Sequence, residues 1–255
     1  MPGKTNSSPI QIVPLTGLPE VARGDDLAGL LIEAVQRQGL VLEPGDVFVV
    51  AQKIVSKAEG RVVPLDSIQP SERAERWASE YHKDPRVIEI VLREASSIVR
   101  MERGVIIVRT HHGFVCANAG VDVSNVPVGT ASLLPEDPDR SARTLHEQLS
   151  RAFGIHVAVI ISDTFGRPWR EGLVNVALGV AGIAPLVDYR GVRDPEGKIL
   201  QATVIALADE LAAASGIVMG KVSQIPAVVV QGVRTSDRVG TARELIRSTE
   251  KDLFR

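Results

Sequence analysis

The chain of 255 residues contains a single cysteine, Cys116. One cysteine cannot form an internal disulfide bond, and it cannot build a zinc site from several thiolates. We therefore expect a cytoplasmic protein in a reducing compartment. Cys116 lies in the apolar stretch GFVCANAG, where a small buried side chain that fills the core is a better interpretation than a nucleophile.

Aromatic residues are also scarce, at 4 % of the chain, so Val, Ile, Leu and Ala must fill the core. No apolar run reaches the ~18 residues that a membrane-spanning helix needs. The net charge of −2 creates no overall field that would favour nucleic acid or an anionic membrane as a partner. No G-x-G-x-x-G or G-x-x-x-x-G-K-[ST] pattern follows an expected strand, which argues against Rossmann and P-loop sites.

The chain does contain a mixed pattern of short β-branched runs and helical stretches. The runs expected to form strands are 10–15, 46–51, 104–109, 156–162 and 227–231. The expected helices are 25–38, 70–80, 87–96, 141–153, 174–181 and 200–214. These elements do not alternate regularly enough for a simple doubly wound sheet.

No flexible linker divides residues 10–233, which we treat as one domain of two lobes with no assigned boundary. The polar residues 1–9 are expected to be a disordered tail without the apolar core of a signal peptide. Residues 234–255 form a charged C-terminal segment, which is compatible with a surface helix.

Three polar segments interrupt the apolar pattern. LTGLPE (15–20) is a tight turn whose backbone N–H groups can hold phosphate oxygens or a base edge, or else an ordinary turn before a helix. VVAQKIVSKAEG (49–60) places lysines after a strand, where they neutralise phosphates or are simply solvated. NAGVDVSNVP (118–127) offers Asp122 as an oxygen ligand for Mg²⁺, although Asx residues also favour such loops for local reasons.

A fourth segment, SDTFGRPWREG (162–172), follows an apolar run. Asp163 and Thr164 stand where the strand is expected to end, and an acid beside a hydroxyl can bind one hard cation. Arg167 and Arg170 can hold phosphate or carboxylate oxygens in bidentate fashion. The alternative is a surface loop in which Arg167 pairs with Asp163.

Seven segments, in this order, carry a resemblance to a known family: GLPE, VAQKIVSKAEG, NAGVDVSNV, SDTFGRPWREG, GIAPLVDYRGVRDPEGK, LADELAAA and MGK. Together they resemble the coenzyme F420-0:γ-glutamyl ligase family over nearly the whole chain. The resemblance implies an α+β fold of two intertwined lobes with mixed sheets, assembled as a homodimer. It also implies a ligase that adds L-glutamate to the deazaflavin precursor F420-0 and converts GTP to GDP and phosphate. The implied cofactors are Mg²⁺ or Mn²⁺, with K⁺ as a further candidate.

The resemblance assigns roles to individual residues. Those that match nucleotide contacts are Leu18, Pro19, Glu20, Val21, Gln52, Lys57, Asn125 and Lys221. Those that match metal ligands are Asp122, Asp163 and Thr164. We expect Asp122, Asp163 and Arg167 to act in catalysis by placing charge, because an activated carboxylate needs no side-chain nucleophile.

Two other functions stay open at this point. One is a different nucleotide-dependent ligase or transferase on the same fold, and the other is a deazaflavin-binding protein without catalysis. The retained Asp122, Asp163 and Thr164 argue against the second. The number of glutamates added, the preferred metal, the form of the precursor and the anion that each arginine contacts are not readable from the residues.

Overall fold

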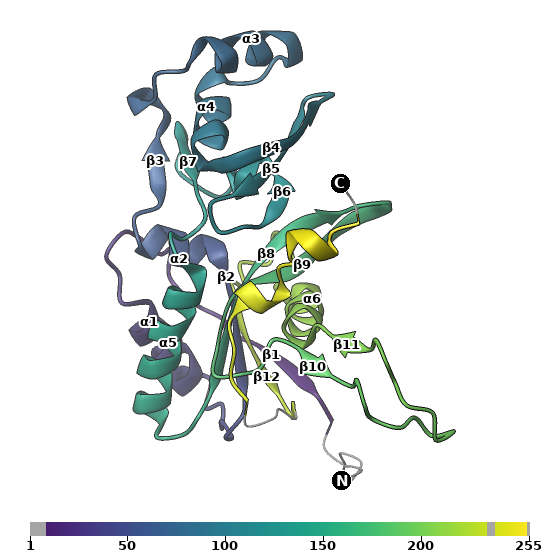
Figure 1. Ribbon diagram of the computed structural model, residues 1–255. Coiled ribbons are helices and arrows are strands. Elements are labelled where there is room, and N and C mark those ends of the chain that lie inside the picture. The colour runs from purple at the N-terminus through teal and green to yellow at the C-terminus, as the bar shows by residue number, and fades with distance from the viewer. Residues whose placement is uncertain (1–8, 234–237, 254–255) are drawn as a thin grey trace.

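The computed structural model describes residues 9–233 and 238–253 and has the expected α+β architecture (Figure 1). Its largest unit is a mixed sheet of five strands in the order β1-β12-β2-β8-β9. The strands are β1 Gln11–Pro14, β2 Val47–Ala51, β8 Ala158–Arg167, β9 Arg170–Ala181 and β12 Ala227–Gln231. β2 and β8 run parallel, and the other neighbouring pairs are antiparallel.

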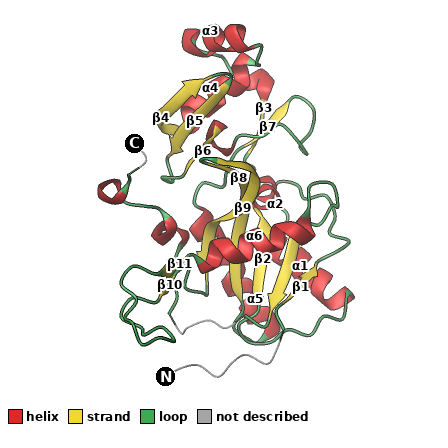
Figure 2. Ribbon diagram, turned by 90° about the vertical axis from the view of Figure 1, so that its right-hand side faces the viewer, coloured by secondary structure: helices red, strands yellow, loops and turns green. Residues whose placement is uncertain are grey.

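Helices cover both faces of this sheet. The helices α1 Leu27–Arg37, α2 Gln52–Ala58 and α5 Pro138–Phe153 contribute to the core on one face. The helix α6 Leu207–Met219 lies across the other face, in front of the sheet in Figure 2. Because side chains on both faces are buried, β2 reads VFVVA, a continuous apolar run rather than an alternating one.

A smaller lobe is inserted between α2 and α5 and lies beyond one end of the sheet (Figure 1). It has its own apolar core, which includes Trp77, Val91 and Ile106. Its strands pair as an antiparallel β4-β5-β6 sheet and a separate β3-β7 pair. The elements of this lobe are β3 Val62–Pro64, α3 Glu72–Tyr81, α4 Pro85–Glu94, β4 Ala95–Glu102, β5 Val105–Thr110, β6 Val115–Ala117 and β7 Thr130–Ser132.

All five expected strands are confirmed, but β8 is longer than expected because it runs on to Arg167. The helix expected at 174–181 is wrong, since these residues form the second half of β9. A short run of small apolar residues fits a helix and a strand equally well, and pairing with β8 decides in favour of the strand. A Cβ at Gly179 would lie 2.1 Å from the carbonyl oxygen of Pro138, so only glycine allows α5 to approach β9 this closely.

The remaining expected helices are confirmed with shifted ends. The helix expected at 200–214 begins only at Leu207, after the short hairpin β10 Val187–Asp188 and β11 Val204–Ile205. The helix expected at 87–96 ends at Glu94, where β4 starts. None of the described helices is long and apolar enough to cross a membrane.

The terminal segments are only partly described. Residues 1–8, which make up nearly all of the expected disordered tail at 1–9, lie outside the described residues, as do 234–237 and 254–255. Between 238 and 253 the chain forms two short 3₁₀ turns, Ala242–Leu245 and Thr249–Lys251, and not one surface helix. Ala242 is buried, and its backbone N–H donates to Asp139 Oδ1 at 2.8 Å.

Candidate functional site

A cavity of about 830 Å³ opens where five separate segments of the chain meet. These segments are the loop after β1, the junction of β2 and α2, the loop at 122–127, the middle of the β8–β9 pair and the residues that follow α6. Every residue predicted to bind nucleotide or metal lines this cavity: Leu18, Pro19, Glu20, Val21, Gln52, Lys57, Asn125, Lys221, Asp122, Asp163 and Thr164. The structure therefore brings together residues that are up to about two hundred positions apart in the sequence.

The strand register explains why the polar residues begin where they do. β2 and β8 are parallel, and their last paired residues are Ala51 and Ser162. The pairing of β2 with β8 ends at the same edge of the sheet for both strands. Gln52 and Asp163, the next residue of each, therefore lie side by side at the cavity. A register shift between Ile161 and Ser162 marks the same point in the β8–β9 pair.

This geometry corrects one expectation. Asp163 and Thr164 do not stand beyond the end of a strand, because β8 continues as a two-stranded ribbon with β9. Asp163 pairs with Val176 and Thr164 pairs with Asn175 across this ribbon. The two site residues are therefore held by backbone pairing on a strand, which fixes their positions more tightly than a loop would.

Asp122 forms the main ion pair of the cavity. Lys53 Nζ lies 2.6 Å from Asp122 Oδ2 and also donates to the carbonyl oxygen of Ser124 at 2.8 Å. The backbone N–H and the hydroxyl of Ser124 each donate to the same carboxylate at 2.8 Å. Burial by itself would raise the pKa of Asp122, but the hydrogen bonds from Lys53 and Ser124 outweigh it and lower the pKa.

Asp163 has the opposite electrostatic environment. Burial raises its pKa from 3.8 to about 6, although the Thr164 backbone N–H and the charges of Lys221 and Lys53 partly offset this. The negative charge of Asp122 raises the pKa further, so the two carboxylates are close enough to repel. An ionised Asp163 is thus a carboxylate with too little positive charge around it.

Thr164 lies within a chain of hydrogen bonds. Its hydroxyl donates to Asn175 Oδ1 at 2.8 Å and accepts from Lys221 Nζ. Asn175 also lines the cavity, yet sequence reasoning missed it because residues 174–181 were assigned to a helix. The cross-strand position opposite Thr164 is the signal that would have identified it, and this signal requires knowledge of the register.

Most of the residues predicted to contact a nucleotide lie on α2 and in the loop after β1. Gly17 has a φ of 70°, which supports the predicted tight turn before Leu18. Glu20 forms an ion pair with Lys57, whose side chain is only 11 % exposed. Gln52 is buried, and its amide oxygen accepts from Ser56 Oγ at 2.9 Å.

Arg167 is the predicted site residue that does not line the cavity. It lies at the turn of the β8–β9 hairpin and donates to the carbonyl oxygen of Glu171 at 2.8 Å. Among the described residues no ion pair joins Arg167 to Asp163, so the surface salt bridge considered from the sequence is absent there. Lys53, one of the lysines in segment 49–60 expected to neutralise phosphates or to be solvated, forms an ion pair with an acidic site residue instead.

The residues fit a divalent cation of the hard, oxygen-binding type. The described residues contain no group of three or more His, Cys, Asp or Glu side chains that could hold a metal. Two carboxylates and one hydroxyl would therefore have to be completed by substrate oxygens and water, which is how Mg²⁺ is commonly held. The ammonium group of Lys53 already provides positive charge at Asp122. The raised pKa of Asp163 marks a carboxylate whose ionised form a bound metal ion would stabilise.

Cys116 is not part of this chemistry. Its side chain is buried, and burial raises the pKa of its thiol to about 12, with a smaller contribution from the charge of Asp163. The thiol therefore stays protonated at neutral pH, and the interpretation of Cys116 as a core-filling residue is confirmed.

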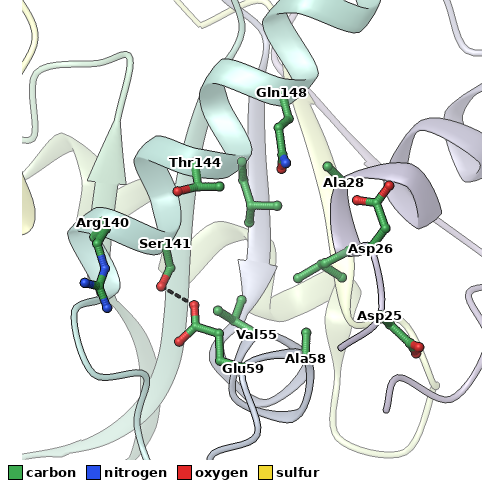
Figure 3. A pocket seen from close by; sticks show the side chains of 12 residues that line it. Asp25, Asp26, Ala28, Val55, Ala58, Glu59, Arg140, Ser141, Thr144 and Gln148 are labelled. Atoms are coloured by element: carbon green, nitrogen blue, oxygen red, sulfur yellow. Dashed lines mark hydrogen bonds between the residues drawn. The ribbon is translucent and has the colours of Figure 1, made fainter. Parts of the chain in front are cut away.

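A smaller pocket of about 330 Å³ lies between α1, α2 and α5 (Figure 3). Its lining contains none of the predicted site residues. Its acidic groups already have local partners, since Asp26 caps α1 through the N–H of Gly29 and Ser141 donates to Glu59. Burial raises the pKa of Glu59. We assign no function to this pocket.

The large cavity combines three carboxylates, Glu20, Asp122 and Asp163, with three lysines, Lys53, Lys57 and Lys221, in one concave surface. This arrangement defines the class of site: it suits oxygen-rich anions together with a hard cation, as in enzymes that use nucleoside triphosphates. The chain belongs to the F420-0:gamma-glutamyl ligase family, whose family model matches residues 17–232. The resemblance seen in the sequence motifs is thereby confirmed.

Individual relatives match over almost their full length. The coenzyme F420:L-glutamate ligase of Methanothermobacter thermautotrophicus is 47 % identical over 251 residues, which cover 96 % of this chain and 99 % of the relative. The protein of the same description from Methanopyrus kandleri is 48 % identical over 96 % of this chain and 97 % of the relative. That from Archaeoglobus fulgidus is 39 % identical, again over 96 % of both chains.

Proposed function

We propose that this protein joins L-glutamate to the deazaflavin precursor F420-0 at the expense of GTP, and that GDP and phosphate are released. The observation that carries the proposal is that the predicted nucleotide and metal residues, far apart in the sequence, converge on one cavity. Membership of the family supports the same reaction class. The names of the close relatives supply the two substrates, glutamate and the coenzyme.

The reaction needs an activated carboxylate, because joining a carboxylate to an amine in water is unfavourable. In the proposed route a carboxylate oxygen of the precursor attacks the γ-phosphorus of GTP, which forms an acyl phosphate and releases GDP. The α-amine of glutamate then attacks the acyl carbon, the C–O bond to phosphate breaks, and the amine loses a proton. Both steps concentrate negative charge, so the site has to supply positive charge and fixed geometry.

The residues of the cavity suit these demands. Lys57 and Lys221 would neutralise phosphate oxygens, and the loop after β1, which contains Leu18, would offer hydrogen bonds to the guanine base together with Gln52 at the start of α2. Asp122, Asp163 and Thr164 would hold the divalent cation, with K⁺ as a further candidate at the site. When bound, the divalent cation supplies Lewis-acid neutralisation of charge on the transferring phosphoryl group.

We also propose that the protein forms a homodimer. The β8–β9 hairpin exposes large apolar side chains, with Trp169 80 % and Leu173 66 % exposed. Ile217 and Val222, at the end of α6 and just after it, are 84 % and 94 % exposed. Apolar surface of this kind is characteristic of protein–protein contacts. The predicted catalytic role of Arg167 would require this hairpin to reach the cavity of a partner copy.

The deciding experiment is mass spectrometry of the deazaflavin precursor after incubation with protein, GTP, glutamate and Mg²⁺ or Mn²⁺. The proposal expects the precursor mass to increase by one or more glutamyl units, and the number of units reports the extent of addition. Matched reactions without GTP and with the Asp163→Asn variant should show no increase. GTP hydrolysis without a glutamyl product would favour a different ligase or transferase. Precursor binding that needs neither nucleotide nor metal would favour a non-catalytic binding protein.

A further inference from the structure

Ser162 carries a buried hydroxyl that has no partner in the folded chain. The residue is 2 % exposed, and its Oγ makes no hydrogen bond within the described residues. A buried hydroxyl without a partner costs free energy, because folding removes its bonds to water and replaces them with nothing. Alanine would fill the same volume without this cost, so packing alone does not account for serine here.

The hydroxyl lies at the boundary between the core and the site. Along β8, Ala158 and Ile160 belong to the apolar core under α6. Side chains alternate between the faces of a strand, so Ser162 and Thr164 continue that same face beyond the core. Ser162 lines the cavity, as does Thr164, which receives the hydrogen bond from Lys221. The sequence on this face thus changes from apolar residues to hydroxyls where the cavity begins.

The surroundings indicate what kind of group could satisfy the hydroxyl. Lys53, Lys57 and Lys221 line the same cavity, where Asp122 and Glu20 pair with Lys53 and Lys57, and each ammonium group can also donate to an anionic oxygen. A serine hydroxyl can donate to an anionic oxygen, and a donor to a charged acceptor forms a stronger hydrogen bond than a donor to a neutral one. A bound phosphoryl or carboxylate oxygen would therefore provide the acceptor that the folded chain lacks.

We propose that the Ser162 hydroxyl donates a hydrogen bond to an anionic oxygen of a bound substrate, which makes Ser162 a substrate-contacting residue of the cavity. This inference rests on the proposed function, because that function brings phosphoryl and carboxylate groups into the cavity. The hydroxyl is already buried without a partner in the free protein. The free protein therefore carries the free-energy cost of the missing hydrogen bond, and substrate binding removes that cost.

The test uses Ser162→Ala with Ser215→Ala as a matched control. Ser215 lies on α6, is fully buried and also has an unpartnered hydroxyl within the described residues, but it does not line the cavity. Both alanine variants should melt at the wild-type temperature or above it without ligands, because each loses an unsatisfied donor. Only Ser162→Ala should bind substrate more weakly. Ser162→Thr keeps the hydroxyl and should retain most of the binding.

Calorimetric titrations with GTP and Mg²⁺, with the precursor and with glutamate identify the source of the oxygen. Ser162→Ala should lower the affinity for one of these ligands by about 10- to 100-fold, which is the range for a hydrogen bond to a charged group. If the acceptor is a phosphoryl oxygen, the affinity for GTP should fall. If it is a carboxylate oxygen, the affinity for the precursor or for glutamate should fall. Wild-type affinity for all three ligands would overturn the inference, as would an equal loss in Ser215→Ala or a marked fall in the melting temperature of ligand-free Ser162→Ala.

These outcomes are separate from those of the proposed function. If the wild-type protein adds glutamate and Ser162→Ala binds and reacts equally well, the inference fails and the proposed function stands. If the wild-type protein adds no glutamate but Ser162→Ala still loses affinity for one anion, the proposed function fails and the contact stands.

Discussion

Replacement of Asp163 by asparagine should stabilise the metal-free protein while it removes activity. Burial raises the pKa of Asp163 from 3.8 to about 6, so ionisation of this carboxylate is less favourable in the folded chain than in the unfolded chain. A rise of roughly two pKa units corresponds to about 3 kcal/mol of folding free energy at neutral pH. Asparagine keeps the shape and the acceptor oxygen but carries no charge, so it should avoid this penalty.

The pH dependence follows from the direction of the shift. Below about pH 4 the acid is protonated in both states, and the penalty is absent. The penalty grows between about pH 4 and about pH 6 and is complete at higher pH. Asp163→Asn should therefore melt above the wild type near neutral pH, by at most roughly 6–12 °C for a chain of this size. The difference should shrink as the pH approaches 4.

The assay pairs two measurements on the same protein. Thermal unfolding is followed in buffer with a chelator at several pH values, and glutamate incorporation is followed with saturating GTP across a Mn²⁺ titration. Asp188→Asn is the control of opposite sign, because the hydrogen bond from Arg190 lowers the pKa of Asp188 to about 2 and its loss should not stabilise the protein. A lower melting temperature of Asp163→Asn at neutral pH, or near-normal incorporation at low Mn²⁺, would refute the reasoning.

Three further predictions concern the same site and its assembly. Asp122→Asn should lower glutamate incorporation by orders of magnitude, whereas Thr164→Val should have a milder effect because water can replace a neutral ligand; equal effects would contradict these roles. GTP should be strongly preferred over ATP, because a site that hydrogen-bonds the guanine edge leaves those groups unpaired with adenine, and comparable turnover with both nucleotides would refute this. Light scattering should give about twice the chain mass of 27.4 kDa, and a mass near that of one chain would argue against the homodimer.

Part of the candidate site could be predicted because some of its residues occur in short segments with local chemical meaning, whereas the roles of the individual nucleotide and metal residues came from the family resemblance. Gly17 before Leu-Pro-Glu predicts a tight turn, and its positive φ is observed. Asp163 stands out because it follows an apolar run, where carboxylates are unusual, and Asp122 in a polar loop is an oxygen ligand suited to Mg²⁺. Strands such as 46–51 and 227–231 are recognisable because their β-branched runs are bounded by turn residues.

The failures at the site share one cause, which is ambiguity in how a strand pairs. Residues 174–181 fit a helix until the register with β8 is known, and this error concealed Asn175 as the partner of Thr164. The same long ribbon moves Arg167 to a hairpin turn outside the cavity of its own chain. Sequence spacing could not foresee this, because Asp163 and Arg167 are only four positions apart but separate along an extended strand.

The sequence by itself determined the family, the strands and the residue types of the site, because these depend on patterns within a few neighbouring positions. The tertiary structure alone decided which charges face one another. Lys53 and Asp122 are 69 positions apart, and the ion pair between them depends on how the smaller lobe sits against the sheet. The buried, unpartnered hydroxyl of Ser162 likewise depends on the tertiary structure, which buries this residue where the cavity begins. Such contacts depend on the register of strands and the placement of lobes, which the long-range packing of the whole chain determines.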